Sequence, residues 1–228
     1  MQSVIFRDRI DAAKKLAERL YWLKDGIQGN RFAASAVIMA IPLGGVVIGD
    51  VIASELGVKL DLVVSRKIGA PSNSELAIGA VMPDGSYFLN EVADMINVSQ
   101  DYIESQINKE VKEIDRRLID FRGSRNYDNE LEGKLAVLVD DGIATGATML
   151  ASARWIKEKH NCKKLVIAVP VAPKEILEDL NNIADKVIVL YTPEPFGAVG
   201  RFYQDFNQVS DEEVKEIMKK YGYNTPNN

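Results

Sequence analysis

The residues best suited to chemistry lie in 138–148, which read Leu-Val-Asp-Asp-Gly-Ile-Ala-Thr-Gly-Ala-Thr. A predicted strand over 134–141 brings Asp140 and Asp141 to its carboxyl end. A loop of small residues and threonines follows and opens directly into a predicted helix. Small residues let the backbone approach a ligand closely, and a helix N-terminus offers unpaired N–H groups and a favourable dipole to an anion. This pattern predicts a phosphate in the loop and a polyol beside the two aspartates.

The alternative interpretation of this segment is an ordinary tight strand–helix turn with N-capping side chains. Each feature alone leaves that alternative ahead, whereas their combination in a strand–loop–helix context favours phosphate binding. The chain contains no G-x-x-x-x-G-K-[ST], which excludes a P-loop. Gly44 and Gly45 are followed by Gly49, which does not make the dinucleotide-binding pattern G-x-G-x-x-G.

The segment V-L-V-D-D-G-I-A-T-G-A-T resembles the phosphoribosyl-pyrophosphate (PRPP) signature of type I phosphoribosyltransferases. Residues 41–45 (Ile-Pro-Leu-Gly-Gly) look like the family's first pyrophosphate-contacting loop. Ser65-Arg66-Lys67 looks like the basic end of the next strand, which also faces pyrophosphate in the family. The resemblance runs in element order over roughly residues 30–205, and it is sharp over about thirty residues.

This resemblance implies a role for each matching residue. Asp140 and Asp141 would hold the ribose 2′- and 3′-hydroxyls, directly or through Mg²⁺, and are the implied metal ligands. Arg66 and Lys67 would neutralise the leaving pyrophosphate, although a solvated strand end is their alternative. The implied PRPP-binding set is Leu43, Gly44, Gly45, Arg66, Lys67, Asp140, Asp141, Gly142, Ile143, Ala144, Thr145, Gly146, Ala147 and Thr148.

The implied reaction displaces pyrophosphate from ribose C1 by a nitrogen nucleophile through an oxocarbenium-like transition state. Mg²⁺ and cationic groups stabilise the departing pyrophosphate, so no covalent nucleophile is required. The single histidine and single cysteine, His160 and Cys162, are therefore predicted to be structural.

The nitrogenous acceptor is predicted to lie under residues 192–206, which resemble the base-binding segment of purine-using members. Phe196, Phe202 and Tyr203 would offer faces to a planar base, and Asp205 an acceptor or a site for Mg²⁺. Packing in the core is the alternative for these aromatic residues. Ala144 stands where members that use 6-oxopurines carry an acid, so a purine is favoured only slightly over other heterocycles.

The elements that position these residues alternate between strand and helix. Short apolar runs suit strands buried on both faces of a parallel sheet, so we expect an α/β fold with a central, mainly parallel sheet and helices on both faces. A hairpin and an inserted long helix complete the type I phosphoribosyltransferase-like fold. The predicted strands are 36–41, 60–65, 134–141, 164–172 and 185–191, with a hairpin of 76–82 and 86–90; the predicted helices are 7–24, 46–56, 99–122, 147–159, 173–182 and 210–221.

We expect one domain over 1–228, with an insertion over 68–132 that holds a lid, the hairpin and the long helix. A C-terminal hood would span 192–228. The small, polar stretch 68–75 is either a mobile cover over PRPP or an ordinary surface loop. The helix over 99–122 would pack on the edge of the sheet or serve self-association of the chain.

Composition limits the class of protein. The chain has 228 residues, of which 46% are hydrophobic and 27% charged, typical of a globular protein. Its net charge of −5 argues against a nucleic-acid partner. No apolar run approaches the ~20 residues that span a bilayer, and the N-terminus lacks a signal-peptide core, so no membrane partner and a cytoplasmic location are expected.

The leading interpretation is an Mg²⁺-dependent phosphoribosyltransferase that transfers the 5-phosphoribosyl group of PRPP to a nitrogenous, purine-like acceptor. A second is a regulatory protein that senses PRPP or a nucleotide with little or no turnover. A third is an unrelated hydrolase that uses the aspartates on Mg²⁺, which gives no account of the Thr-Gly-Ala-Thr loop.

Overall fold

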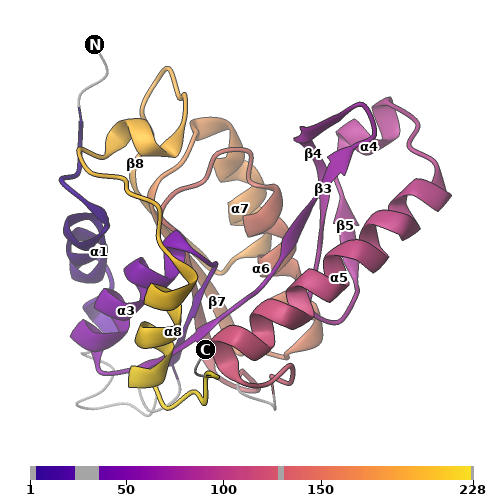
Figure 1. The fold of residues 1–228 in the computed structure, drawn as a ribbon. Helices are drawn as coiled ribbons and strands as arrows, with labels where there is room; N and C mark the ends of the chain where they lie inside the picture. The colour runs from indigo at the N-terminus through magenta and orange to yellow at the C-terminus, as the bar shows by residue number, and fades with distance from the viewer. Residues whose placement is uncertain (1–3, 24–35, 128–130, 227–228) are drawn as a thin grey trace.

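The computed structural model describes residues 4–23, 36–127 and 131–226. Its centre is a five-stranded sheet in the order β2-β1-β6-β7-β8, in which all neighbouring strands are parallel (Figure 1). The strands are β1 (Ala36–Ala40), β2 (Lys59–Leu62), β6 (Leu135–Val139), β7 (Lys164–Val171) and β8 (Lys186–Tyr191). Every residue of β1 and β6 is buried, as all-apolar strands of a two-sided parallel sheet must be.

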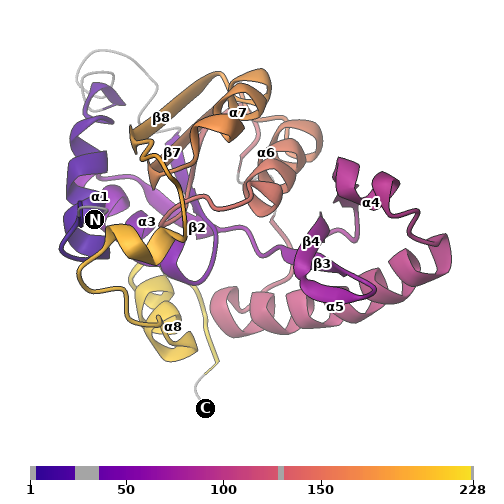
Figure 2. The same ribbon diagram turned by 90° about the horizontal axis from the view of Figure 1, so that it is seen from above.

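Helices cover both faces of this sheet (Figure 2). One face carries α1 (Arg9–Glu18), α3 (Gly44–Leu56) and α8 (Asp211–Lys220); the other carries α6 (Ala147–Lys159) and α7 (Leu177–Ile183). The chain runs outward in opposite directions from β1 and from β6, so these neighbouring strands form the topological switch point. Ligands of open α/β sheets bind at the carboxyl ends of the strands at such a point.

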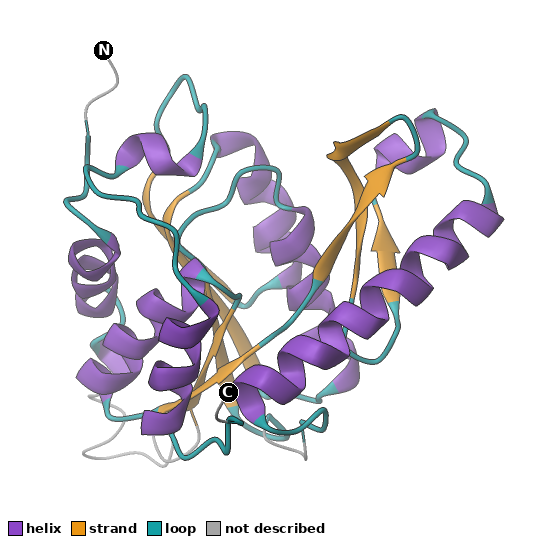
Figure 3. Ribbon diagram, in the orientation of Figure 1, coloured by secondary structure: helices purple, strands orange, loops and turns teal. Residues whose placement is uncertain are grey.

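A smaller antiparallel sheet, in the order β3-β4-β5, stands beside the main one with a long helix along it (Figure 3). Its strands are β3 (Arg66–Ala70), β4 (Asn73–Val81) and β5 (Tyr87–Leu89), and it is followed by α4 (Glu91–Met95) and α5 (Gln100–Arg122). The predicted α/β class, the hairpin and the long helix are therefore confirmed. The helix α5 packs against β3 and α8.

A buried ion pair ties the end of α5 to the central sheet. The Arg122 guanidinium donates from Nε to Asp61 Oδ1 at 2.7 Å and from Nη2 to Asp61 Oδ2 at 2.9 Å. The Asp61 side chain is fully buried and that of Arg122 is 4% exposed. Because each charge would be costly to bury alone, the pair fixes how the helix sits on β2.

Some predicted boundaries differ from the structure. Residues 68–75 are not a loop: they contain the end of β3 and the start of β4, which meet in a tight turn. The predicted strand over 60–65 ends at Leu62, and the helix predicted over 46–56 begins two residues earlier, at Gly44. The helix predicted over 7–24 is shorter in the structure, where α1 spans Arg9–Glu18 and residue 24 lies outside the described residues. The sequence does not predict the short helix α4. Residues 128–130 of the predicted insertion lie outside the described residues, as do the ends of the predicted domain and hood.

Among the helices that the structure describes, none combines the length and the apolar character that crossing a bilayer requires.

Candidate functional site

Two loops meet at the switch point of the central sheet. The Ile41 amide donates to the Val139 carbonyl oxygen at 3.0 Å, so the segment after β1 and the segment after β6 leave the sheet side by side. A Cβ added at Gly45 would lie 3.0 Å from Oδ1 of Asp140, and one added at Gly44 would overlap Oδ2 of Asp141. The peptide bond between Pro42 and Leu43 is cis. The glycines are therefore required because the loop lies directly against the two carboxylates.

The carboxylates of Asp140 and Asp141 occupy a desolvated position. Burial is the largest cause that raises the pKa of Asp140 well above its ordinary value, and the charge of Asp141 adds to it. Burial also raises the pKa of Asp141, while the Arg9 guanidinium opposes that rise. The Asp141 amide donates to Asp140 Oδ1 at 2.8 Å, which fixes the Asp140 carboxylate relative to the backbone of Asp141.

Arg9 and Tyr203 hold Asp141 from two sides. Arg9 Nε lies 2.8 Å from Asp141 Oδ2, and the Tyr203 hydroxyl donates to the Asp141 carbonyl oxygen at 2.6 Å. Burial raises the pKa of Tyr203 above its ordinary range, so the phenol keeps its proton for this hydrogen bond. Arg9 comes from α1, 132 residues before Asp141, and sequence reasoning missed it.

One signal in the sequence marks Arg9. It is the first residue of α1, after the N-cap Asp8, whose carboxylate accepts from the Asp11 amide. A cation at this end of a helix opposes the macrodipole, which favours acidic side chains there. An arginine in that position indicates a second partner, although the sequence does not say which.

The loop between β6 and α6 has the geometry of an anion cradle. Gly146 has φ = 81°, a conformation that suits glycine, and α6 begins at the next residue. In the described chain, the amides of 144–148 donate to no acceptor outside the helix. Ile143 differs, because its amide donates to the Val171 carbonyl oxygen at 2.9 Å and its side chain is buried. Ile143 therefore offers neither its amide nor its side chain to a ligand in this loop.

The basic pair begins β3 rather than ending β2. Arg66 Nε donates to Glu110 Oε2 of α5 at 2.9 Å, and its side chain is 36% exposed. Lys67 is exposed. No hydrogen bond or ion pair joins Arg66 to the two aspartates within the described residues.

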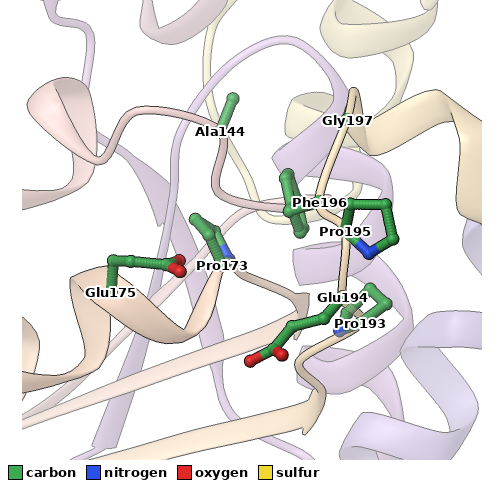
Figure 4. A pocket seen from close by; sticks show the side chains of 8 residues that line it. All are labelled: Ala144, Pro173, Glu175, Pro193, Glu194, Pro195, Phe196 and Gly197. Carbon is green, nitrogen blue, oxygen red and sulfur yellow. The ribbon is translucent and has the colours of Figure 1, made fainter.

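A cavity of about 750 Å³ opens beside the loop at 144–148. Figure 4 shows that its lining comes from three segments: Ala144 after β6, Pro173 and Glu175 at the helical turn η2 (Lys174–Ile176) after β7, and residues 193–197 after β8. The half-buried Phe196 supplies its aromatic surface, and the charged side chains that line it, Glu175 and Glu194, are both acidic. The cavity therefore suits a planar ligand with hydrogen-bond donors.

The other predicted acceptor-binding residues lie elsewhere. Phe202 is fully buried and packs 5.1 Å from the Phe196 ring, between centroids. Tyr203 is 4% exposed and contacts Phe6 and Phe206. Asp205 is exposed and accepts from the Asn207 amide at 3.2 Å. Phe202 and Tyr203 thus present no open ring face, and only Phe196 lines the cavity.

His160 and Cys162 stand away from this site. His160 is the C-cap residue of α6, its ring 4.1 Å from the Trp155 ring, and burial lowers its pKa. Burial raises the pKa of the Cys162 thiol, which disfavours the reactive thiolate.

The aspartate pair suits Mg²⁺ in chemical type, since this ion is commonly held by one or two carboxylates together with substrate phosphates. The described residues contain no cluster of three or more His, Cys, Asp or Glu side chains arranged for a metal. A metal here would therefore depend on oxygens supplied by a ligand.

Comparison with known proteins agrees with this geometry. A family model described as phosphoribosyl transferase domain matches residues 7–199. The chain belongs to the phosphoribosyltransferase family.

Relatives of this family member are found among curated and solved proteins. Two from Mycobacterium tuberculosis, strains CDC 1551 and H37Rv, are provisionally named phosphoribosyl transferases, and each is 38% identical over 217 residues. That alignment covers 95% of this chain and 47% of each relative, so the chain spans about half their length. The crystal structure of TT1426 from Thermus thermophilus is similar, with a TM-score of 0.77 and 37% identity, covering 95% of this chain and 99% of that chain.

Proposed function

We propose that this chain transfers the 5-phosphoribosyl group of PRPP to a nitrogen of a small planar acceptor and releases pyrophosphate. One observation carries the proposal: the glycine loop after β1 lies directly against the carboxylates after β6, beside a loop whose described amides donate to no acceptor outside the helix. Anion-binding amides, polyol-binding carboxylates and a lined cavity are thereby gathered at one edge of the sheet.

Each part of this edge has a place in the reaction. Thr145, Thr148 and the amides of 144–148 bind the 5′-phosphate, and Asp140 with Asp141 accept hydrogen bonds from the ribose hydroxyls. The backbone of 43–45 faces the pyrophosphate. The ribose is then fixed with its C1 toward the cavity that Phe196 lines.

The bond between C1 and the pyrophosphate oxygen breaks with its electron pair on that oxygen, and the acceptor nitrogen forms the new bond to C1. The acceptor nitrogen then loses its proton to water. Carboxylates near the sugar stabilise the positive charge that develops on the ring in the transition state. Mg²⁺, held by Asp140 and Asp141 together with the substrate, would neutralise charge on the departing pyrophosphate.

The acceptor is a flat nitrogenous heterocycle stacked on Phe196. Ala144 supplies no carboxylate for proton transfer, whereas Glu175 and Glu194 line the cavity and are available as hydrogen-bond acceptors. A base with amino or protonated ring nitrogens fits these two side chains better than one with only carbonyl oxygens on that edge.

The sensor alternative is supported by one contact. Arg66, proposed to neutralise the leaving group, instead has its Nε on Glu110. A PRPP-binding protein whose Arg66 stays on Glu110 would bind its ligand and turn it over slowly.

The test is calorimetric titration of the chain with PRPP in Mg²⁺ buffer, followed by pyrophosphate release with a panel of purine, pyrimidine and other amino-bearing heterocycles. Binding with release supports the transferase, and binding without release on any acceptor supports the sensor. If PRPP does not bind at concentrations up to millimolar, both are excluded.

A further inference from the structure

Arg9 is a point of contact between three parts of the molecule. Its Nε lies 2.8 Å from Asp141 Oδ2, and its Nη1 donates to the Asn207 carbonyl oxygen at 2.7 Å. Its Cζ lies 3.9 Å from the centre of the Phe206 ring. The helix α1, the acidic end of β6 and the hood segment after η3 (Val199–Phe202) therefore converge on one guanidinium.

The ion pair of Arg9 with Asp141 is withdrawn from solvent. The two side chains are 12% and 15% exposed. A pair at the surface contributes little to stability and screens easily, whereas a largely buried pair has a defined geometry, because breaking it strands a charge. A Cβ placed on Gly44 would also come within 2.8 Å of Arg9 Nε, so the pair lies against the pyrophosphate-facing loop.

The contacts of Arg9 leave part of each group available to a ligand. Arg9 occupies Oδ2 of Asp141, so Oδ1 is the oxygen left for a sugar hydroxyl. The Phe206 ring and the Asn207 carbonyl fix the plane of the guanidinium, and a fixed guanidinium fixes the carboxylate that it holds. In the described chain, Arg9 Nη2 makes no hydrogen bond.

We propose that Arg9 is a positioning residue of the sugar site: it orients the Asp141 carboxylate toward the ribose hydroxyls and compensates its charge. This inference rests on the proposed function, because it requires the polyol that Asp141 would bind. It gives the helix α1 a part in ligand binding. It also accounts for an arginine at the N-terminal end of α1, where the helix dipole disfavours a cation.

The test compares ribose 5-phosphate with inorganic phosphate as probes, each titrated calorimetrically in Mg²⁺ buffer. Inorganic phosphate has no hydroxyl groups for the Asp141 carboxylate to bind as it would bind those of a sugar, so it serves as an internal control. The variants are Arg9→Met, Arg9→Lys, Asp141→Asn and the double variant Arg9→Met/Asp141→Asn. Arg19→Met is the matched control, because Arg19 lies at the exposed other end of α1.

We expect Arg9→Met to weaken ribose 5-phosphate binding by roughly tenfold or more, the typical effect of losing a hydrogen bond to a charged group, and to leave phosphate binding unchanged. Arg9→Lys keeps a cation in reach of a single carboxylate oxygen and should bind within about threefold of the wild type. The double variant should bind no more weakly than Asp141→Asn alone, because the two residues act through one interaction. Arg19→Met should bind as the wild type does.

Three results would overturn the inference while leaving the proposed function standing. They are wild-type affinity for ribose 5-phosphate in Arg9→Met, equal losses for ribose 5-phosphate and inorganic phosphate, and additive losses in the double variant. If Arg9→Met does not fold, Arg9→Gln, which also removes the charge but keeps a polar side chain, gives the same cycle with Asp141→Asn. If the wild type itself binds neither PRPP nor ribose 5-phosphate, the proposed function fails first.

Discussion

Replacing the carboxylate of Asp140 or of Asp141 by an amide removes a charged acceptor from the sugar site. We expect Asp140→Asn and Asp141→Asn each to weaken PRPP binding by roughly ten- to a hundredfold, which corresponds to about 1.5–3 kcal/mol for a hydrogen bond to a charged group. The fold should persist because an amide fills the same volume, and Asp141→Asn should melt at a lower temperature because it leaves the Arg9 guanidinium without its ion-pair partner. Calorimetric affinity and circular dichroism measure the two effects.

The matched control for these variants is Asp101→Asn, an exposed aspartate in the first turn of α5. It should bind PRPP as the wild type does. Unchanged PRPP affinity in both Asp140→Asn and Asp141→Asn would remove the acidic pair from the site.

Gly146 is the second residue whose type the site requires. Valine there must adopt φ = 81°, and its Cβ would overlap the Ile176 side chain. A β-branched residue resists this conformation and would stand beside the phosphate amides, so Gly146→Val should abolish stabilisation by ribose 5-phosphate in a thermal-shift measurement.

Gly57→Val provides the comparison, since Gly57 also has a positive φ of 68° but has no atom near the added Cβ and lies at the end of α3. It should melt at a lower temperature yet still respond to ribose 5-phosphate. A soluble Gly146→Val protein that responds as strongly would place the phosphate elsewhere.

For individual residues, the sequence predicts those members of the site that follow one another closely in the chain. Asp140, Asp141 and the glycine-threonine loop follow one strand, so a short motif contains both their identity and their arrangement. Arg9 contacts Asp141 across 132 residues, and no local pattern encodes that separation. For Phe202 and Tyr203, the residue type was compatible with stacking or with packing, and only burial distinguished the two.

At the scale of elements, the loop after β8 is the part of the site that we propose to select the acceptor. Phe196→Ala should raise the KM for the acceptor, because stacking of a base on an aromatic ring is worth roughly 1–3 kcal/mol if figures from nucleic-acid binding transfer. PRPP affinity should barely change, since its proposed contacts lie on other loops. Initial rates at saturating PRPP and calorimetry with PRPP measure the two quantities.

The same variant tests the packing interpretation of this loop. Phe196 is half-buried and packs against Phe202, so some loss of melting temperature is expected. If Phe196→Ala melts at a much lower temperature while the acceptor KM stays constant, the ring belongs to the core and the acceptor binds elsewhere. Leu76→Ala, at an exposed position in β4, is the control for removing an apolar side chain.

Element prediction succeeded where apolar residues form a short unbroken run, as in β1 and β6, or recur at helical spacing, as in α5. It failed over 68–75, where Gly69, Pro71 and several polar residues indicate a loop although the chain forms the end of β3 and the start of β4. These strands are stabilised by pairing with one another and by packing on α5 and α6, which is tertiary context that a local pattern does not contain.

For the whole molecule, binding at the switch point should appear as stability. A ligand that binds only the native state at a hundred times its Kd adds about 2.7 kcal/mol. For a chain of this size, that corresponds to a rise in Tm of roughly 5–10 °C. We expect PRPP with Mg²⁺ to produce such a shift, and ADP-ribose at the same concentration to produce a smaller one.

The control for this measurement is the Asp140→Asn/Asp141→Asn double variant, which should lose most of the shift. An equal shift in the double variant would mean that PRPP stabilises the protein from another surface. Absence of any shift in the wild type at millimolar PRPP would contradict the proposed function.

The hydrogen bonds between residues 5–7 and 202–205 join the two ends of the chain beside the aspartates. Arg9 reaches Asn207 across 198 residues. Contacts so distant in sequence carry a large entropic cost of closure and form slowly. On the ribosome, the strands β1 and β6 are complete while the hood is still to be made, and at typical synthesis rates the interval is on the order of several seconds. A nascent chain can therefore possess the loop at 144–148 and both aspartates before the contacts of Tyr203 with Asp141 and of Asn207 with Arg9 exist. The acidic pair reaches its final arrangement only after the segment over 202–207 has been made.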